Sequence, residues 1–175
     1  MKKITCFALA AVLCAGLTAC GGNNQAGTDN QKKVYKIATD TTFPPFEFQD
    51  DNQQYVGIDI DILAEIAKDQ GFEYELQPLG FNAAVAALES SQADGVIAGM
   101  SITEDRQKKY DFSEAYYDSG VVMAIKADNE EIKSYEDLKG KKVAVKNGTE
   151  GATFAESIKN QYGFNLAYFD ESPYM

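Results

Sequence analysis

Residues 57–80 read GIDIDILAEIAKDQGFEYELQPLG, and this stretch decides the fold because a helical pattern leads directly into a strand pattern. Its first half repeats apolar residues at helical spacing, with Asp59 or Asp61 expected as the N-terminal cap and Gly71 as the stop. The apolar face of that helix is formed by Ile62, Leu63, Ile66 and Ala67. Apolar and polar residues then alternate over 72–79, which predicts a half-buried strand.

The alternation of strand and helix patterns continues on both sides of this stretch. A short strand is expected over 34–40, and the small-residue sequence NAAVAALESSQ at 82–92 predicts a helix capped by Asn82. The sequence DGVIAGM at 94–100 predicts a buried strand, and TEDRQKK at 103–109 predicts the first turn of another helix. Repeated β-α-β patterns predict a mostly parallel sheet with helices on its faces.

A second unit of the same kind follows. The sequences SGVVMAIKAD at 119–128 and KKVAVKNGTEGATFAESIKNQYG at 141–163 repeat the pattern, and the capped turn SYEDLKG at 134–140 separates them. We therefore expect an α/β protein of two lobes, with lobe 1 over 34–118 and lobe 2 over 119–175.

Composition excludes several function classes. The chain has 175 residues, and 16 Lys and Arg residues against 27 Asp and Glu residues give a net charge of −11. A phosphate backbone would be repelled by this charge, so nucleic acid is not expected as a partner. Histidine is absent, which removes the commonest general base and the commonest metal ligand. We expect no metal, no cofactor and no catalytic residue.

The N-terminus has the features of a secretory signal. A positively charged start precedes the apolar run ITCFALAAVLCAGLTA at 4–19, and a polar stretch follows. The sequence LTAC at 17–20 resembles the lipobox of bacterial lipoproteins, which implies cleavage before Cys20 and acylation of its thiol. We expect a signal peptide over 1–19 and a lipidated cysteine with a flexible linker over 20–33. An ordinary signal with chance cysteines is the alternative.

Ligands of open α/β sheets bind at the carboxyl ends of strands, and three loops follow such ends here. The first loop is DTTFPPFEF at 40–48. The chain must bend at Pro44-Pro45, because neither proline can donate a hydrogen bond within a sheet. Two of the three phenylalanines of this loop are expected in the core, since buried aromatic side chains usually pack.

The second loop is AGMSITEDR at 98–106. Gly99 allows close approach of the backbone to a ligand, Ser101 offers a hydroxyl, and Arg106 falls in the first turn of a helix that Thr103 is expected to cap. A cation in this place opposes the helix dipole, so it calls for an anionic partner such as a ligand carboxylate.

Arg106 of the second loop also has an alternative role. It could form a surface ion pair with Glu104 or Asp105 instead of binding a ligand.

The third loop is KNGTEGAT at 146–153, where Lys146, Thr149 and the N–H groups of a helix start can hold polar ligand atoms. Its spacing differs from that of a phosphate-binding loop.

Several linked motifs, in order over nearly all of residues 34–175, resemble the polar amino-acid-binding proteins of bacterial ABC importers, most closely their glutamine-binding members. The motifs are IATDTTFPPFEFQD, YVGIDIDILAEIAK, ADGVIAGMSITEDRQKKYDFSEAYYDSG and YEDLKGKKVAVKNGT. The resemblance implies a periplasmic-binding-protein-like fold of type II, with two lobes of mixed, mostly parallel sheets flanked by helices. It also implies a monomeric, lipid-anchored receptor of the cell envelope that delivers glutamine or another polar amino acid to an inner-membrane permease.

The resemblance also implies roles for residues of lobe 1. Arg106 would clamp the α-carboxylate of the ligand, helped by the hydroxyl of Ser101 and the backbone of Gly99. Asp40 would receive polar groups at the side-chain end of the ligand.

Aromatic residues would enclose the ligand between them. Phe43 and Phe81 would sandwich its aliphatic part, while Phe46 and Phe48 would stay in the core.

Lobe 2 would contribute Lys146 and Thr149, which close on the ligand. Glu150 stands where glutamine-binding relatives have a glycine, so arginine or lysine is the alternative ligand. The chain stops at YFDESPYM, inside the expected second lobe. We therefore expect lobe 2 to be incomplete, Val143 and Val145 to be uncovered, and amino-acid binding to be weak.

Two other function classes are separable from a receptor. A few dehydratases of the cyclohexadienyl or arogenate type resemble the same fold, and a carboxylate with Lys146 could in principle perform acid-base chemistry. The third class is a surface lipoprotein that has kept the fold without binding a ligand.

Overall fold

The computed structural model describes residues 33–172, which belong to one unit, Lys32–Met175. The expected signal peptide, Cys20 and nearly all of the expected linker lie outside the described residues. None of the helices described between residues 33 and 172 has the length and apolar character needed to cross a bilayer.

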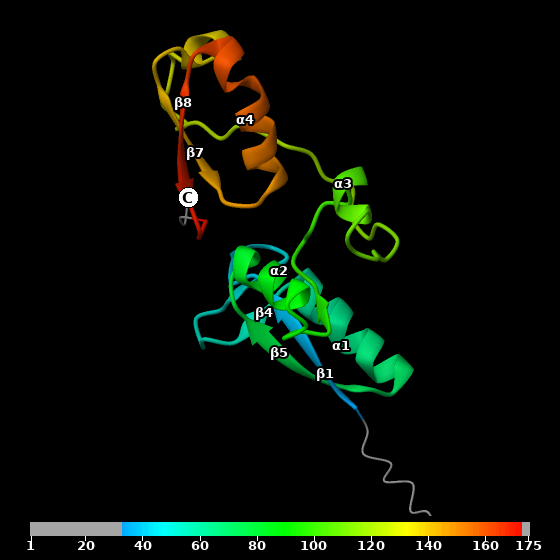
Figure 1. The fold of residues 1–175 in the computed structure, drawn as a ribbon. Coiled ribbons are helices and arrows are strands. Elements are labelled where there is room, and N and C mark those ends of the chain that lie inside the picture. Colours follow the sequence, from blue (N-terminus) through cyan, green and yellow to red (C-terminus); the bar gives the residue numbers. More distant parts are fainter. Residues whose placement is uncertain (1–32, 173–175) are drawn as a thin grey trace, which may run out of the picture. The chain divides into compact units, whose positions relative to one another are not determined.

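The first sheet is parallel and is built around β1 (Val34–Thr39). β1 lies between β5 (Glu73–Pro78) and β6 (Gly95–Val96), and it pairs with both in parallel. Helices α1 (Ile58–Gln70) and α2 (Phe81–Glu89) form the crossovers between these strands (Figure 1). The predicted β-α-β order is confirmed, although β6 is much shorter than the expected strand over 94–100.

A small antiparallel sheet, which the sequence did not predict, is inserted between β1 and α1. It consists of β2 (Thr42–Phe43), β3 (Glu47–Gln49) and β4 (Tyr55–Val56). The predicted bend at Pro44-Pro45 is confirmed, because these prolines form the turn between β2 and β3, with a cis peptide bond. The turn brings Phe43 opposite Glu47 in the register of the two strands.

Helix α1 ends as predicted but begins differently. Gly71 terminates it in the left-handed conformation, with φ of 68°. The expectation that Asp59 or Asp61 caps its N-terminus is wrong, because Gly57 occupies the cap position. Asp59 is fully buried and its carboxylate is used elsewhere, whereas Asp61 is exposed.

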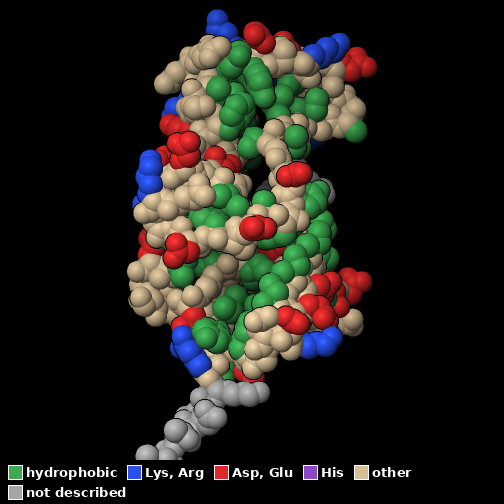
Figure 2. Space-filling model, turned by 90° about the vertical axis from the view of Figure 1, so that its right-hand side faces the viewer, with side chains coloured by type: hydrophobic (Ala, Val, Ile, Leu, Met, Phe, Trp, Pro, Cys, Tyr) green, Lys and Arg blue, Asp and Glu red, His purple; other side chains and the backbone are tan. Residues whose placement is uncertain are grey.

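The apolar face of α1 is only partly covered. Leu63 and Ala67 are buried, but Ile66 remains 49% exposed. Large hydrophobic side chains are also exposed elsewhere in the described chain, and Figure 2 shows hydrophobic side chains gathered over the face that it presents.

Helix α2 begins two residues earlier than predicted. Gly80 is its N-cap, so Asn82 lies inside the helix and the expectation that it caps the helix is wrong. The carboxylate of Asp40 accepts the N–H of Phe81 and thereby supplies the capping interaction from the neighbouring strand end. Small residues of α2 pack against β1 and the segment before β6; the buried cluster consists of Ala38, Ala84, Ala87 and Ala93.

The chain between α3 (Glu104–Gln107) and residue 134 has no regular secondary structure. Thr103 caps α3 as predicted, because its hydroxyl accepts the N–H of Arg106. The strand pattern at 119–128 does not form a strand. No strand among the described residues pairs with it, and Val122 is 87% exposed.

The remaining elements form a parallel pair of strands covered by a helix. The 3-10 turn η1 (Tyr135–Leu138) precedes β7 (Lys142–Lys146), α4 (Glu150–Tyr162) and β8 (Asn165–Phe169), and β7 pairs with β8 in parallel. In Figure 1, α4 lies along this pair.

A second core lies beneath α4. Its buried members are Leu138, Ala155 and Phe164. Val143 and Val145 of β7 are half-buried against this cluster, so the expectation that they are uncovered is wrong. Helix α4 therefore covers this face of β7.

Candidate functional site

Asp40 lies at the end of β1 and is almost completely buried, with 2% exposure. Its Oδ1 atom accepts the N–H groups of Thr41, at 2.7 Å, and of Phe81, at 3.1 Å. Its Oδ2 atom accepts from Nζ of Lys146 at 2.5 Å. The carboxylate that was predicted to receive ligand groups therefore already has three partners within the chain.

Lys146 lies at the end of β7, and its side chain is 11% exposed. Besides Asp40, its Nζ atom has the hydroxyl of Thr42 at 3.4 Å. The first and third of the predicted loops are thus brought together, because Lys146 at the end of β7 contacts Asp40 at the end of β1.

Arg106 is held by backbone oxygens of two loops. Nη1 donates to the carbonyl of Ser101 at 2.9 Å, and Nη2 donates to the carbonyl of Gly148 at 2.8 Å. The guanidinium carbon lies 5.7 Å from the centroid of the Phe81 ring, within cation-π range. The side chain is 15% exposed, so the guanidinium is positioned before any ligand binds.

The anionic neighbour of Arg106 is Glu150, with Oε1 at 4.0 Å from Nη2. The alternative of a surface ion pair with Glu104 or Asp105 is not formed, since Asp105 pairs with Lys108 instead. Glu150 is the first residue of α4, a place that favours an acidic side chain.

Thr149 uses its hydroxyl to fix the start of α4. The oxygen accepts the N–H of Ala152 at 3.3 Å and donates to the carbonyl of Lys146 at 2.8 Å. The residue therefore shapes the loop that presents Lys146 and Gly148.

The three phenylalanines of the bend differ in burial. Phe43 is 38% exposed and stacks on Phe46, with ring centroids 5.1 Å apart. Phe46 is 8% exposed and Phe48 is half-buried. Phe81 is buried beneath the guanidinium of Arg106. Phe43 thus offers an accessible ring, and the sandwich with Phe81 stays a prediction.

Gly99 and Ser101 take part mainly through their backbones. The N–H of Gly99 donates to Oδ2 of Asp59 at 2.6 Å, and its φ is 52°. A Cβ atom at this position would lie 2.7 Å from Cε1 of Phe43, so only glycine lets the ring lie against the strand end. Ser101 is exposed, and its carbonyl orients Arg106.

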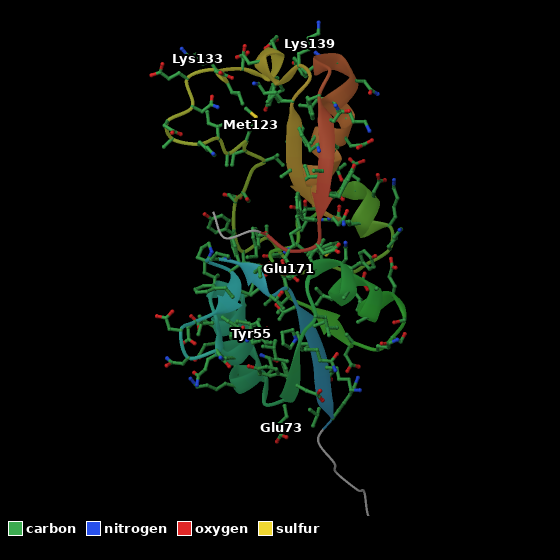
Figure 3. The ribbon with its side chains drawn as sticks, turned by 90° about the vertical axis from the view of Figure 1, so that its left-hand side faces the viewer. Tyr55, Glu73, Met123, Lys133, Lys139 and Glu171 are labelled. Carbon is green, nitrogen blue, oxygen red and sulfur yellow. The ribbon has the colours of Figure 1, made fainter. Side chains whose placement is uncertain are left out.

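The sequence reading missed Thr41, Thr42 and Glu171. Oε2 of Glu171 accepts the hydroxyls of Thr41 at 3.1 Å and Thr42 at 2.7 Å, and Glu171 is labelled in Figure 3. Ser172 donates its N–H to the Thr42 hydroxyl at 3.2 Å. The carboxyl-end rule would have selected this segment if β8 had been recognised as a strand.

The charged groups around these loops do not balance. Arg106 and Lys146 supply two cations, and Asp40, Glu150 and Glu171 supply three carboxylates, which leaves a net charge of −1. Such an arrangement can bind a ligand carboxylate at Arg106. Its excess of carboxylate oxygens can also accept hydrogen bonds from donor groups of the ligand.

Comparison with known proteins places these residues in a sequence family. The profile of the family described as bacterial extracellular solute-binding proteins, family 3, matches residues 35–166. Most of the described chain, including the ends of β1 and β7, falls within that match.

Two curated relatives are informative. The arginine-binding extracellular protein ArtP of Bacillus subtilis (strain 168) is 37% identical over 164 residues, which cover 94% of this chain and 63% of the relative. The L-cystine-binding protein TcyJ of Escherichia coli (strain K12) is 37% identical over 139 residues, which cover 78% of this chain and 51% of the relative. The chain thus spans between half and two thirds of the length of these relatives.

Solved structures of related proteins have the same fold as this chain. An ancestral arginine-binding protein bound to arginine is 42% identical, has a TM-score of 0.74, and is matched over 79% of this chain and 61% of its own. An ancestral arginine-binding protein bound to glutamine also gives 42% identity and a TM-score of 0.74, with 79% and 60% coverage. The predicted α/β fold with parallel sheets flanked by helices is confirmed.

Proposed function

Because the chain belongs to the bacterial extracellular solute-binding proteins, family 3, we propose that it captures a polar L-amino acid and delivers it to an ABC-type importer. Family membership confirms the resemblance found in the sequence, and the names of the relatives support a solute-binding role in place of an enzymatic one. The observation that carries the amino-acid proposal is the guanidinium of Arg106, which two backbone carbonyls hold in place over an aromatic ring.

Arg106 supports binding of the α-carboxylate. A guanidinium has five N–H donors, and the described residues use two of them, one for Ser101 and one for Gly148. The remaining donors can form a bidentate pair with a carboxylate. Since the side chain is already oriented, less conformational entropy is lost when the ligand arrives.

Two candidates remain for the side chain of the ligand. Glutamine is the first candidate, because Asp40 and Lys146 are an acceptor and a donor for a side-chain amide, although these two groups pair with each other in the structure. The excess of one carboxylate, with Glu150 near Arg106, supports arginine as the second candidate. Both amino acids are represented among the ligands of the related ancestral structures.

Binding can be tested with a thermal-shift screen followed by calorimetry. The screen compares glutamine, arginine, lysine and glutamate with glucose and a dipeptide. A ligand at about 100 times its dissociation constant should stabilise the fold by about 2.7 kcal/mol. Stabilisation by a sugar or dipeptide and by none of the amino acids would refute the proposal, whereas no response to any compound would favour a lipoprotein that does not bind ligand. Consumption of prephenate or arogenate would indicate the dehydratase.

The proposal also includes the cell-envelope anchor and the partner. We expect Cys20 to be lipidated, the mature protein to be a monomer held at the membrane, and an inner-membrane permease to receive the ligand. The mass of the mature N-terminus after expression in a bacterium tests the anchor. The Cys20→Ser variant should lose the lipid mass and leave the membrane fraction. An unmodified Cys20 in the wild-type protein would refute lipidation.

A further inference from the structure

A buried carboxyl group lies directly behind the proposed site and is not used by it. Glu47 of β3 is completely buried, with 0% exposure. Both of its carboxyl oxygens are inaccessible to solvent, and neither has a hydrogen-bond partner among residues 33–172. An ionised carboxylate in such a place would be strongly unfavourable, so its state requires an explanation.

The neighbouring acid, Asp59 of α1, is also completely buried but is fully engaged. Oδ2 accepts the N–H of Gly99 at 2.6 Å, and Oδ1 accepts the hydroxyl of Tyr116 at 2.9 Å. Its own N–H donates to the carbonyl of Phe46 at 3.0 Å. Because both oxygens are acceptors, Asp59 is the member of the pair that holds the negative charge.

The charged groups that face Glu47 do not neutralise it. They are Asp59 from α1, Asp40 from the end of β1 and Lys146 from the end of β7. Lys146 already pairs with Asp40. Burial, followed by the charge of Asp59, raises the pKa of Glu47 to about 10. Burial and the same charge also raise the pKa of the Tyr116 hydroxyl, which stays a donor.

We propose that Glu47 is held as a neutral acid beside the Asp59 carboxylate, and that these two buried residues position Gly99 and Phe43 at the amino-acid site. Glu47 is therefore a positioning residue, and its part in ligand binding rests on the function proposed above. The connection is direct on both sides. Phe43 is opposite Glu47 in the β2–β3 register, and Asp59 holds the N–H of Gly99, against which the Phe43 ring lies.

The proposal has a signature in the pH dependence of stability. The pKa of Glu47 is raised in the folded state from 4.5 to about 10, so its contribution to stability is complete below about pH 4.5 and is lost as the pH rises towards 10. Between these limits the unfolded chain has released one proton more than the folded protein. The unfolding equilibrium constant should therefore increase about tenfold per pH unit from this group.

The test compares urea unfolding of the wild type and Glu47→Gln between pH 5 and pH 9. The amide is neutral and close in shape to the protonated acid, so the ratio of the wild-type to the variant unfolding constant should rise towards about tenfold per pH unit. Asp59→Asn is a second variant that removes the neighbouring charge; because burial is the larger cause of the raised pKa of Glu47, the pH dependence should persist but end at a lower pH. Glu73→Gln is the control, because Glu73 is exposed on β5 and is labelled in Figure 3.

The positioning role of Glu47 is tested separately, by the NMR chemical shift of the Gly99 amide and by the affinity for the amino acid. In the wild type the Gly99 signal should move and affinity should fall as the pH approaches 10, whereas Glu47→Gln should show neither change. A constant ratio of unfolding constants across the pH range would overturn the neutral state of Glu47. A Gly99 signal that titrates equally in both proteins would overturn the positioning role. Failure to bind any amino acid refutes the function proposed above and leaves the unfolding and Gly99 measurements decisive for this inference.

Discussion

Nζ of Lys146 lies 2.5 Å from Oδ2 of Asp40, and this ion pair joins the end of β7 to the end of β1. The side chains are 11% and 3% exposed, so solvent screens the pair little. Removing one partner of a buried pair leaves an uncompensated charge, which costs more than the pair itself contributes.

Lys146→Met is therefore expected to lower the free energy of unfolding by about 3 kcal/mol in urea titrations at pH 7. Asp40 retains two backbone donors, so the fold should survive. Adding Asp40→Asn to Lys146→Met should recover part of the loss, because the amide oxygen still accepts from the backbone and no charge is buried.

The control is Lys141→Met, because Lys141 pairs with Glu131 through side chains that are 39% and 78% exposed. A pair of that kind contributes little, so the control should unfold nearly as the wild type does. Equal losses in the two variants would show that the Lys146–Asp40 pair has no special weight.

Arg106→Lys should weaken amino-acid binding by about 10- to 100-fold, since the charge is kept but the planar fork is lost. An ammonium cannot reach the carbonyls of Ser101 and Gly148 in the same geometry and bind a carboxylate at the same time. Arg106→Ala should lose more affinity while the protein stays folded.

Calorimetry measures both variants against Lys108→Ala, which changes an exposed cation in the residue that follows α3. Affinity equal to that of the wild type in Arg106→Ala would show that the carboxylate is bound elsewhere.

Gly148→Ala should disturb the loop that holds Arg106. The new Cβ would lie 2.2 Å from Oδ1 of Asn82, and φ at this position is 73°. We expect a loss of about 2 kcal/mol in unfolding free energy, from the clash and the backbone strain together, and weaker ligand binding.

Two variants separate these terms. Gly71→Ala has a similar φ of 68° but nothing within 4 Å of the new Cβ, so it reports the strain alone. Combining Gly148→Ala with Asn82→Ala removes the clashing amide and should return the cost to the level of Gly71→Ala. If it does not, Asn82 is not the obstacle.

The sequence predicted the parts of the fold that depend on local periodicity. The strand at β1, the switch from α1 to β5 across Gly71, and the capped start of α3 all follow spacing and cap residues. The candidate binding loops could also be predicted, because a general rule places binding sites of open α/β sheets at the carboxyl ends of strands.

Other features depended on tertiary contacts that no local pattern records. Asp59 resembles a helix cap in the sequence, but its carboxylate accepts from Gly99, 40 residues away. Asn82 also resembles a cap, but Asp40 takes that role by accepting the N–H of Phe81, 41 residues away. Glu171 could not be recognised because its contacts with Thr41 and Thr42 depend on β8, whose short pattern was not identified.

The final prediction concerns how Glu150 affects the charge of the preferred ligand. Its Oε1 atom lies 4.0 Å from Nη2 of Arg106, and its side chain is 32% exposed. The carboxylate therefore competes with a ligand carboxylate for Arg106, and it also attracts a cationic side chain. Glu150→Gln changes the balance from three carboxylates against two cations to two against two.

Glu150→Gln is accordingly expected to lower affinity for arginine about fivefold, which is the effect of a partly exposed charge, and to leave affinity for glutamine equal or slightly higher. Calorimetric titrations of both amino acids give the ratio of their dissociation constants, and the difference between the proteins should shrink at high salt because the interaction is partly screened. Glu65→Gln is the control, since Glu65 is 74% exposed on α1 and pairs only with Lys68 among the described ion pairs. An unchanged ratio in Glu150→Gln would show that the ligand side chain does not sense this carboxylate, and the preference would then have to be set by Asp40, Lys146 and Glu171.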